Sequence, residues 1–585
     1  GPIAALTALA GFAVAFWTVT FGRIISHTIM LVPVAAMAAY SFWRARSAAG
    51  WPVNAWSVAS GVWLGLSLNA YTAARSLPAV FAVFGVYVVI AHRSEWKRWL
   101  AHIGIVLMVA SLVALPLVVY LAQNPAADDL SFFDIDRPLR ELRGGDLQPV
   151  IETSLRTLGM FAFTSDPLPY YTVPGRPVFE PFGALLLAIG LWTVLRRWRT
   201  PPYAFVILWF CVSLVPGMFS QPAPNSTRTL GVQIVLFAIV GIAVDTLLRW
   251  VTATETRRHG EKHTVVSGSS RSRIAYAALG IVFAGNLIWT AHDYFTLWPS
   301  IDSVRFWHHS GVQAVAGRVQ ADPDTSPVVL CLPPFLIDEN IPWWKPGWQH
   351  MRYLLHRPDV AVRYYDCAEA LVFVDGPARY AFPDAAGVNA LSPFPIYAEF
   401  LAAAGPTLDI LPDRLGVIAR VDRPPASLTR LLTDVTATPV VSWAPEAGGG
   451  AARLPVSFGG RAEFLGYTLH PSSFILHPLS TLELTTYWRV TADLPPQLAL
   501  FTHVLSADGA IVTQQDRLAL TSASLRPGDV FAQMHRLTLP ADVPDGDYAL
   551  SIGLYTYVDG KRLPIVEAGQ PRGDRLWLRS ITVRK

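Results

Sequence analysis

Charged residues are scarce in this chain. Asp, Glu, Lys and Arg make up 15% of its 585 residues, hydrophobic residues make up 52%, and the mean hydropathy is positive. Soluble domains usually carry about 25% charged residues, so this composition excludes a wholly soluble protein. The formal net charge of +4 is also small. It provides no strong basic field, and we expect no nucleic-acid partner.

Cysteine is nearly absent. Three cysteines cannot form a disulfide framework. Cys211 falls inside a long apolar stretch, where we expect it to pack. Cys331 and Cys367 belong to the more polar half of the chain, where an oxidising compartment would allow one bridge between them. Two buried thiols on neighbouring strands would give the same pattern, so both interpretations stay open.

Long apolar stretches, in contrast, fill residues 1–298. Each is close to the length of about 20 apolar residues that a bilayer core requires. We predict nine spans, at residues 2–20, 26–43, 56–72, 77–92, 99–122, 181–195, 203–220, 230–248 and 274–294. The sequence therefore predicts a polytopic α-helical membrane protein, with a membrane domain over residues 1–298 and a soluble part after it.

Positive charge alternates between the loops of this membrane domain. The short turns on one side hold only Arg23, Arg75 and Arg228. Because Lys and Arg are retained on the cytoplasmic side, we expect these turns and residues 295–585 to be extracytoplasmic, in a plasma-membrane protein. The opposite, basic loops contain Arg44, Arg46, Arg93, Lys97, Arg98, Arg196, Arg197, Arg199, Arg249, Arg257, Arg258, Lys262, Arg271 and Arg273.

The soluble half divides by composition. Residues 299–425 alternate short apolar runs with helical patterns, which predicts a small α/β domain. No glycine-rich phosphate loop follows its expected strands, so we expect no nucleotide site. Residues 426–452 are rich in Pro, Ala and Gly and indicate a linker. Residues 453–585 alternate apolar and polar residues in short runs between turns, which predicts a β-sandwich or jelly roll.

Polar residues gather in the outward turns of the membrane domain. Ionisable side chains are costly at membrane depth, and those that persist often line a substrate path. Arginines on one face can bind a lipid phosphate through charge-assisted hydrogen bonds; alternatively, each guanidinium simply extends to the lipid headgroups. The candidate set for binding a lipid phosphate is Arg23, His27, Tyr71, Arg75, Asn225 and Arg228.

The outer loop of residues 123–180 is rich in acidic residues. Such residues can supply a general base or ligands for a divalent metal. They can also belong to a solvated amphipathic segment, since residues 149–158 have the pattern of an interfacial helix. Asp166 lies in a run dense in proline and aromatic residues, which favours a fixed shape, and it is the candidate catalytic carboxylate. The acids are Asp128, Asp129, Asp134, Asp136, Glu141, Asp146, Glu152, Asp166 and Glu180.

Four loose motifs follow one another along the expected outer face. They are AFWTVTFGRIISHTIM, GVWLGLSLNAYTAARSLPAVF, GMFAFTSDPLPYYTVPGRPVFEP and SQPAPNSTRTLGVQIV. Their order over residues 1–298 resembles bacterial glycosyltransferases of the GT-C superfamily, a multi-pass group that includes aminoarabinose transferases and protein O-mannosyltransferases. The tail, with GYTLHPSSF and TTYWRV, is similar to the sandwich appended to some prokaryotic members.

This resemblance implies transfer of a sugar from a polyprenyl-phosphate carrier to a glycan, lipid or protein acceptor on the outer face, with inversion at the anomeric carbon. A carboxylate would accept the acceptor's proton, and cationic groups would stabilise the departing lipid phosphate. Arg75 and Arg228 would bind that phosphate, and Arg23, His27 and Tyr71 would line the same cavity. The need for a divalent metal stays open.

Two other functions stay open. A transporter or flippase of lipid-linked sugars would need polar residues along the spans, which hold few besides Asn69, Asp245 and Asn286. A non-catalytic scaffold would use the spans to anchor a carbohydrate-binding sandwich. Trp488 alternates into the expected core of that sandwich, so we expect it to pack there and not to stack on a sugar.

The family's principal acidic motif, in the first outer loop after the first transmembrane helix, has no counterpart in this chain. We therefore expect the sequence to begin around the third or fourth helix of a longer protein, with the main catalytic acid upstream of Gly1. A chain restarted upstream should transfer sugar from a polyprenyl-phosphate donor in membrane vesicles, and these 585 residues should not. Transfer by the 585-residue chain would contradict this placement.

Overall fold

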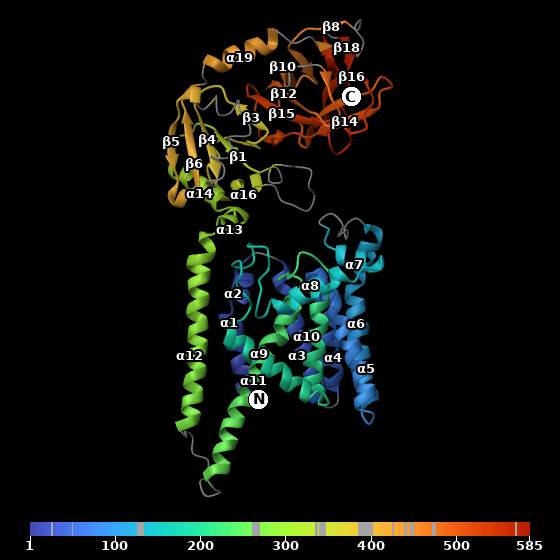
Figure 1. The fold of residues 1–585 in the computed structure, drawn as a ribbon, viewed down its shortest axis with the longest axis vertical. Helices are drawn as coiled ribbons and strands as arrows, with labels where there is room; N and C mark the ends of the chain where they lie inside the picture. Colours follow the sequence, from blue (N-terminus) through green and yellow to red (C-terminus); the bar gives the residue numbers. More distant parts are fainter. Residues whose placement is uncertain are drawn as a thin grey trace. The chain divides into compact units, whose positions relative to one another are not determined.

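The chain forms two compact units, Gly1–Val304 and Arg305–Lys585. The first is helical and the second is mainly β-structure (Figure 1). The computed structural model describes residues 1–24, 27–48, 51–125, 134–259, 270–333, 337, 347–383, 400, 402–423, 426–437, 441–444, 450–470, 475–567 and 570–584.

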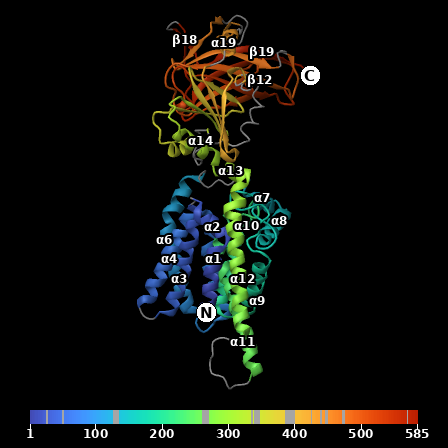
Figure 2. The ribbon, with the colours of Figure 1, turned by 90° about the vertical axis from the view of Figure 1, so that its left-hand side faces the viewer.

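Long helices make up the first unit. They are α1 (Pro2–Val14), α2 (Phe16–Arg23), α3 (Leu31–Ser47), α4 (Trp51–Ala70), α5 (Leu77–Ala91), α6 (Trp96–Gln123), α9 (Pro181–Arg196), α10 (Pro201–Met218), α11 (Gln233–His259) and α12 (Ser270–His292). The loop between α6 and α9 adds two short helices, α7 (Arg137–Arg143) and α8 (Gln148–Gly159). Helix α12 lies at the edge of the bundle, beside α1 and α11 (Figure 2).

Within the described residues, five helical stretches are long and apolar enough to cross a membrane. They are His27–Ser47, Thr72–Ala91, Trp96–Gln123, Pro201–Met218 and Leu230–Val251. Helices α1 and α2 meet at a bend of 60° and add a sixth if the pair is one broken span. The remaining three expected spans coincide with α4, α9 and α12. All nine expected stretches are thus helical, and the crossing of the membrane by all nine stays a prediction.

Glycines allow the helices to approach closely. A Cβ at Gly190 of α9 would overlap the carbonyl oxygen of Ile239 in α11. A Cβ at Gly241, on another part of α11, would overlap the carbonyl oxygen of Ala4 in α1. Both side-chain positions are filled by neighbouring backbone, so only glycine fits. Small residues at contacts of this kind are typical of membrane helices, which associate by close packing.

The second unit contains a five-stranded mixed sheet of order β2-β1-β4-β6-β5. Its strands are β1 (Val328–Cys331), β2 (Val362–Tyr365), β4 (Ala378–Pro383), β5 (Thr407–Ile410) and β6 (Gly416–Val421). Strand β1 runs parallel to β2 and β4, whereas β6 runs antiparallel to β4 and β5. Helix α14 (Ser310–Ala321) packs on β4 and β6 and also contacts α16 (Gly347–Leu354). This sheet and its helices share a hydrophobic core.

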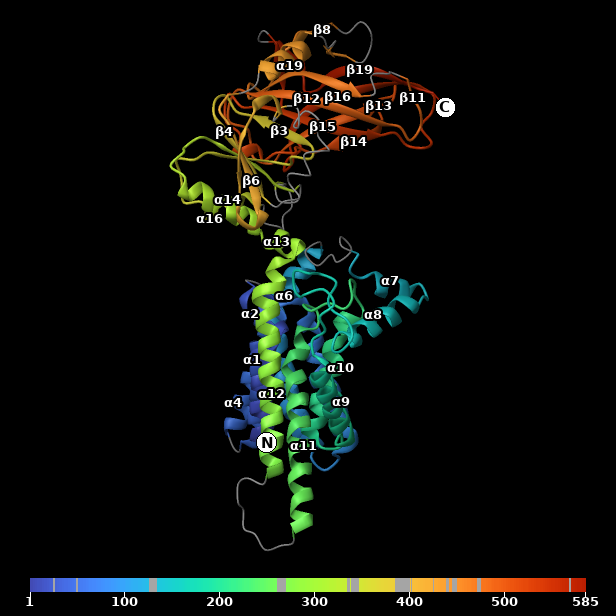
Figure 3. The ribbon, with the colours of Figure 1, turned by 60° about the vertical axis from the view of Figure 1, so that its left-hand side comes forward.

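Two larger, mainly antiparallel sheets form the β-rich remainder, with β11 parallel to β19 as the exception. The first has the order β18-β17-β9-β10-β12-β15-β3, and the second has the order β14-β13-β16-β19-β7-β8, with β11 beside β19. Buried residues of both sheets form one core, as in a sandwich (Figure 3). Trp488 is fully buried there, 5.0 Å from the ring of Phe464, which confirms its packing role. The main strands are β9 (Val456–Phe458), β10 (Ala462–His470), β11 (Ile475–Leu476), β12 (Thr481–Val490), β13 (Leu498–Leu505), β14 (Ile511–Asp516), β15 (Val530–Thr538), β16 (Gly546–Thr556), β17 (Ile565–Glu567), β18 (Gln570–Gly573) and β19 (Leu576–Val583).

Two of the expected boundaries in the soluble half are wrong. Strand β3 (Ala370–Phe373), from the expected α/β domain of residues 299–425, pairs with β15 of the sandwich. The expected linker, residues 426–452, contains α19 (Ala426–Ala437), β7 (Val441–Ser442) and β8 (Ala451–Ala452). Strand β7 pairs with β19, so this segment extends a sheet of the sandwich. Strands β7 and β8 have two residues each, and strands this short need few apolar residues, so a linker-like composition does not reveal them.

The structure joins Cys331 and Cys367 in a disulfide, with a Cα–Cα distance of 5.3 Å. Cys331 ends β1, and Cys367 follows the parallel neighbour β2. Of the two interpretations left open by the sequence, the bridge is the one found. Cys211 is free and lies exposed on α10, so its expected packing role is wrong.

Replacement of both Cys331 and Cys367 by alanine should destabilise the second unit. A bridge across 36 residues restricts the unfolded chain, and its loss typically costs about 2–4 kcal/mol. Calorimetry of the purified protein should show a lower unfolding temperature for this unit. Cys211→Ala is the matched control and should leave it unchanged. Equal unfolding temperatures for the double variant and the control would contradict the bridge.

Candidate functional site

Asp166 joins two loops at one end of the helical bundle. Its Oδ1 accepts a hydrogen bond from the backbone N–H of Leu168, at 2.9 Å, within its own loop. Its Oδ2 accepts one from the backbone N–H of Ser226, at 2.6 Å, in the loop between α10 and α11. The residue is 2% exposed. The carboxylate therefore fastens residues 160–180 to residues 219–229.

A buried arginine anchors the same loop to α12. Arg176 Nη1 donates to Asp293 Oδ2 at 2.8 Å, and its Nη2 donates to the Thr290 hydroxyl at 3.1 Å. The guanidinium also lies between two rings, 4.2 Å from that of Trp289 and 4.5 Å from that of Phe16. The Arg176–Asp293 pair was not anticipated from the sequence, because its members are 117 residues apart. It holds the loop in place beside Asp166.

Arg228 is held in position by its own loop. Its Nη1 donates to the Gln221 carbonyl oxygen at 2.6 Å, and its backbone N–H donates to Asn225 Oδ1 at 3.0 Å. The nearby Tyr71 side chain acts to raise the pKa of Arg228. Asn225, a predicted ligand residue, is 3% exposed, and its amide oxygen serves this turn. Its amide oxygen is therefore engaged within the loop.

Two tyrosines complete the cluster. The Tyr171 ring stacks on Phe21, with centroids 5.2 Å apart, and the Tyr71 ring lies 6.3 Å from that of His27. Burial raises the pKa of Tyr171, and the charges of Tyr71 and Asp166 raise it further. We call Asp166, Tyr171, Tyr71 and Arg228 the loop cluster. Its members come from three loops that follow α4, α8 and α10.

Burial dominates the electrostatics of the loop cluster. It raises the pKa of Asp166 above its ordinary value, although the hydrogen bonds from Ser226 and Leu168 and the charge of Arg228 act in the opposite direction. Burial likewise lowers the pKa of Arg228, against the effects of Tyr71 and Asp166. A partly desolvated cation beside tyrosine hydroxyls interacts more strongly with an anion than an exposed one does.

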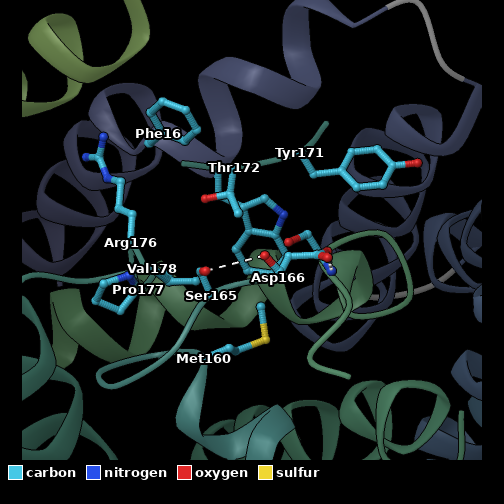
Figure 4. A pocket seen from close by; sticks show the side chains of 11 residues that line it. Phe16, Met160, Ser165, Asp166, Tyr171, Thr172, Arg176, Pro177 and Val178 are labelled. Carbon is cyan, nitrogen blue, oxygen red and sulfur yellow. Dashed lines mark hydrogen bonds between the residues drawn. The ribbon is translucent and has the colours of Figure 1, made fainter. Parts of the chain in front are cut away.

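A small cavity borders the cluster. Its volume is about 20 Å³, close to that of one water molecule. Figure 4 shows Asp166, Tyr171 and Arg176 around it, with Phe16 and Met160. A sugar ring does not fit inside this cavity, so a sugar would have to bind outside it.

Two other predicted residues, Arg23 and Arg75, are exposed. Arg23 is exposed, and its guanidinium lies 5.6 Å from the ring of Tyr294, near the end of α12. This contact differs from the expected shared cavity, because α2 bends away from α1 by 60° and carries Arg23 with it. Arg75 is exposed on the short helix η2 (Thr72–Ser76), which follows Tyr71 directly. The structure thus brings Tyr71 and Arg228 near Asp166, with His27 beside Tyr71, and it places Arg23 against Tyr294.

The other acids of the outer loop have structural partners. Asp134 and Asp136 pair with Arg140, Glu141 with Arg137, and Glu152 with Arg156. Asp146 accepts from the backbone of Gln148, and Glu180 caps α9 by accepting from Gly183. Asp128 and Asp129 lie outside the described residues. In the part of the chain that the structure describes, no group of three His, Cys, Asp or Glu residues is placed to hold a metal ion.

Comparison with known proteins gives little guidance. No protein-family model and no curated protein matches the sequence. Among solved structures, the chain is similar to the C-terminal domain of wzt, with 18% identity and a TM-score of 0.16. The match covers 22% of this chain and 77% of that domain. A score this low carries no argument about fold or function.

Asp166→Ala should loosen the connection between the two loops. The change leaves two buried N–H groups without acceptors, which costs about 1–3 kcal/mol each. Hydrogen exchange at Leu168 and Ser226 should therefore accelerate roughly 5- to 150-fold. Glu152→Ala, which removes only an exposed ion pair of the same outer loop, is the control. Unchanged exchange in Asp166→Ala would show that the carboxylate does not hold the loops.

Proposed function

We propose that the protein is a membrane glycosyltransferase of the GT-C type. It would move a sugar from a polyprenyl-phosphate carrier to an acceptor on the outer face of the plasma membrane, with inversion. The observation that carries the proposal is the loop cluster, in which Arg228 and two tyrosines meet at the loop ends of apolar helices. The phosphate of a lipid-linked sugar is an anion, and in a membrane it would lie at the level of these loop ends.

The cluster has the chemistry that a departing lipid phosphate requires. Arg228 is fixed by Gln221 and supplies further N–H donors, and Tyr71 adds a hydroxyl. Charge-assisted hydrogen bonds of this kind bind phosphate strongly. Because the donors are already oriented, they would stabilise the charge that develops as the glycosidic bond breaks.

Asp166 has a different place in the proposed reaction. Its burial and its two backbone donors leave no direct path for an acceptor hydroxyl. An acceptor would reach it only through the water-sized cavity. We therefore assign Asp166 as a positioning residue, which orients the loop of Arg228. In this proposal another base takes the proton from the hydroxyl group that receives the sugar.

The disulfide supports the proposed orientation. Disulfides persist in oxidising compartments and are rare in the cytosol. The bridge between Cys331 and Cys367 thus favours an extracytoplasmic second unit, as the Lys and Arg bias of the loops does. A lipid-linked sugar would then react on the side where this unit lies.

The helices offer little support for a transporter. The polar residues expected in the spans have local partners: Asn69 donates to the Gly65 carbonyl, Asp245 pairs with Arg249, and Asn286 donates to Glu180. Groups satisfied in this way stabilise helices and their contacts. They are not arranged as a polar path.

Arg228→Ala should weaken binding of polyprenyl phosphate by the protein in lipid nanodiscs. A hydrogen bond to a charged group contributes about 1.5–3 kcal/mol, so the affinity should fall at least about tenfold. Arg228→Lys keeps the charge and should retain part of the binding. Arg156→Ala is the matched control, because that guanidinium is exposed and pairs with Glu152. Unchanged affinity in Arg228→Ala would contradict the enzyme and favour a non-catalytic scaffold.

A further inference from the structure

The second unit contains a large open cavity that the proposed function does not use. Its volume is about 810 Å³, within the usual range for small-molecule sites. The walls come from the end of α16 and the residues after it, from β2, and from the turn of residues 521–526. These segments are far apart in the sequence and belong to one compact unit.

The charged residues that line this cavity are all basic. Arg352, His356, Arg357 and Arg526 contribute to the walls, and the described lining includes no carboxylate. Arg357 is neutralised outside the cavity, because its Nη2 donates to Asp359 Oδ2 at 2.6 Å. Arg352 and Arg526 have no ion pair within the described residues. Among the described lining residues, the charges of Arg352 and Arg526 are therefore uncompensated.

Both of these arginines are placed to meet a ligand. Arg526 Nη1 donates to the carbonyl oxygens of Ala523 and Leu525, each at 3.1 Å. These bonds orient the guanidinium without neutralising it, and its remaining N–H groups can bind an anion. Arg352 lies close enough to Tyr364 to oppose the rise in the pKa of that tyrosine caused by burial. It therefore shares the side of the cavity formed by β2.

The rest of the wall is apolar or carries hydroxyl groups. Leu355, Pro358 and Val362 are not fully buried and offer an apolar surface to the cavity, above the buried Met351 and Tyr364. Thr521 and Ser524 lie beside Tyr364, because the Thr521 N–H donates to the Tyr364 carbonyl oxygen at 3.0 Å and the Tyr364 N–H donates to Ser524 Oγ at 3.2 Å. A sugar ring has an apolar face of C–H groups and a rim of hydroxyls, and a carboxylate or phosphate on that ring would match the arginines.

We propose that this cavity binds a sugar unit that carries a carboxylate or a phosphate. Arg352 and Arg526 bind the anionic group, and the apolar wall at Leu355 and Val362 contacts the ring. This site is separate from the loop cluster and does not depend on the proposed transferase activity. It gives the second unit a ligand of its own.

The test uses the full chain in lipid nanodiscs and titration calorimetry. The probes are glucuronate and glucose 6-phosphate, with glucose and inorganic phosphate as the neutral and sugar-free comparisons. We expect at least one charged sugar to bind at least about tenfold more tightly than glucose and than phosphate, since hydrogen bonds to charged groups are the stronger ones. The pair of probes also distinguishes a carboxylate from a phosphate ligand.

Variants locate the binding in the cavity. Arg352→Ala and Arg526→Ala should each weaken binding of the charged sugar at least about tenfold. Arg352→Ala removes none of the hydrogen bonds described here, so it should leave the unfolding temperature unchanged. Arg423→Ala and Arg453→Ala remove exposed arginines of the same unit that do not line the cavity, and they should bind as the parent does.

Four results would overturn the proposal. If glucose binds as tightly as the charged sugars, the anionic group does not contribute to binding. If inorganic phosphate binds as tightly as the charged sugars, the sugar ring does not contribute. No binding of either charged sugar would reject the site altogether. Equal losses in the control variants would place the binding outside the cavity. None of these results bears on Arg228 and polyprenyl phosphate, so the two proposals fail separately.

Discussion

Close contact between helix backbones is the constraint on which the membrane unit depends. In a bilayer, the lipid is as apolar as the side chains, so burial of apolar surface gives helices little reason to associate. Contact at Gly190 and Gly241 brings α11 against both α9 and α1. Dispersion forces increase steeply at such distances. Because α11 is held between α9 and α1, the ends of these helices are fixed, and the loops that connect them begin and end at fixed positions.

Those loops are held by ion pairs and hydrogen bonds of charged side chains that are buried from solvent. Arg176 and Asp293 are 7% and 4% exposed, and a pair at that depth is stable only when its remaining polar atoms are satisfied. Thr290 and the two flanking rings meet this need. Asp166 plays a similar part with backbone donors. The loop cluster thus owes its geometry to residues that bind no ligand in the proposed reaction.

The sequence could predict the helices but not what their ends contact. Each expected span is a helix, because a long apolar run has few other stable forms in a bilayer. Arg23 was expected beside His27, yet a bend between α1 and α2 directs it toward Tyr294. No local pattern reports such a bend in advance. In the soluble half, β3 is a run of four buried apolar residues, and such a run does not reveal which sheet it will join. Pairs as distant as Arg176 and Asp293 are beyond any local pattern.

The position of β3 has a consequence for how the second unit can be divided. Its pairing with β15 covers what would otherwise be the free edge of a six-stranded sheet. A fragment of residues 453–585 would lack this strand and would present the unpaired N–H and C=O groups of β15 to other molecules. Bare edges of this kind recruit further strands and promote aggregation. The sandwich therefore depends on a strand from outside residues 453–585, and we expect the sandwich and the smaller sheet to fold as one unit.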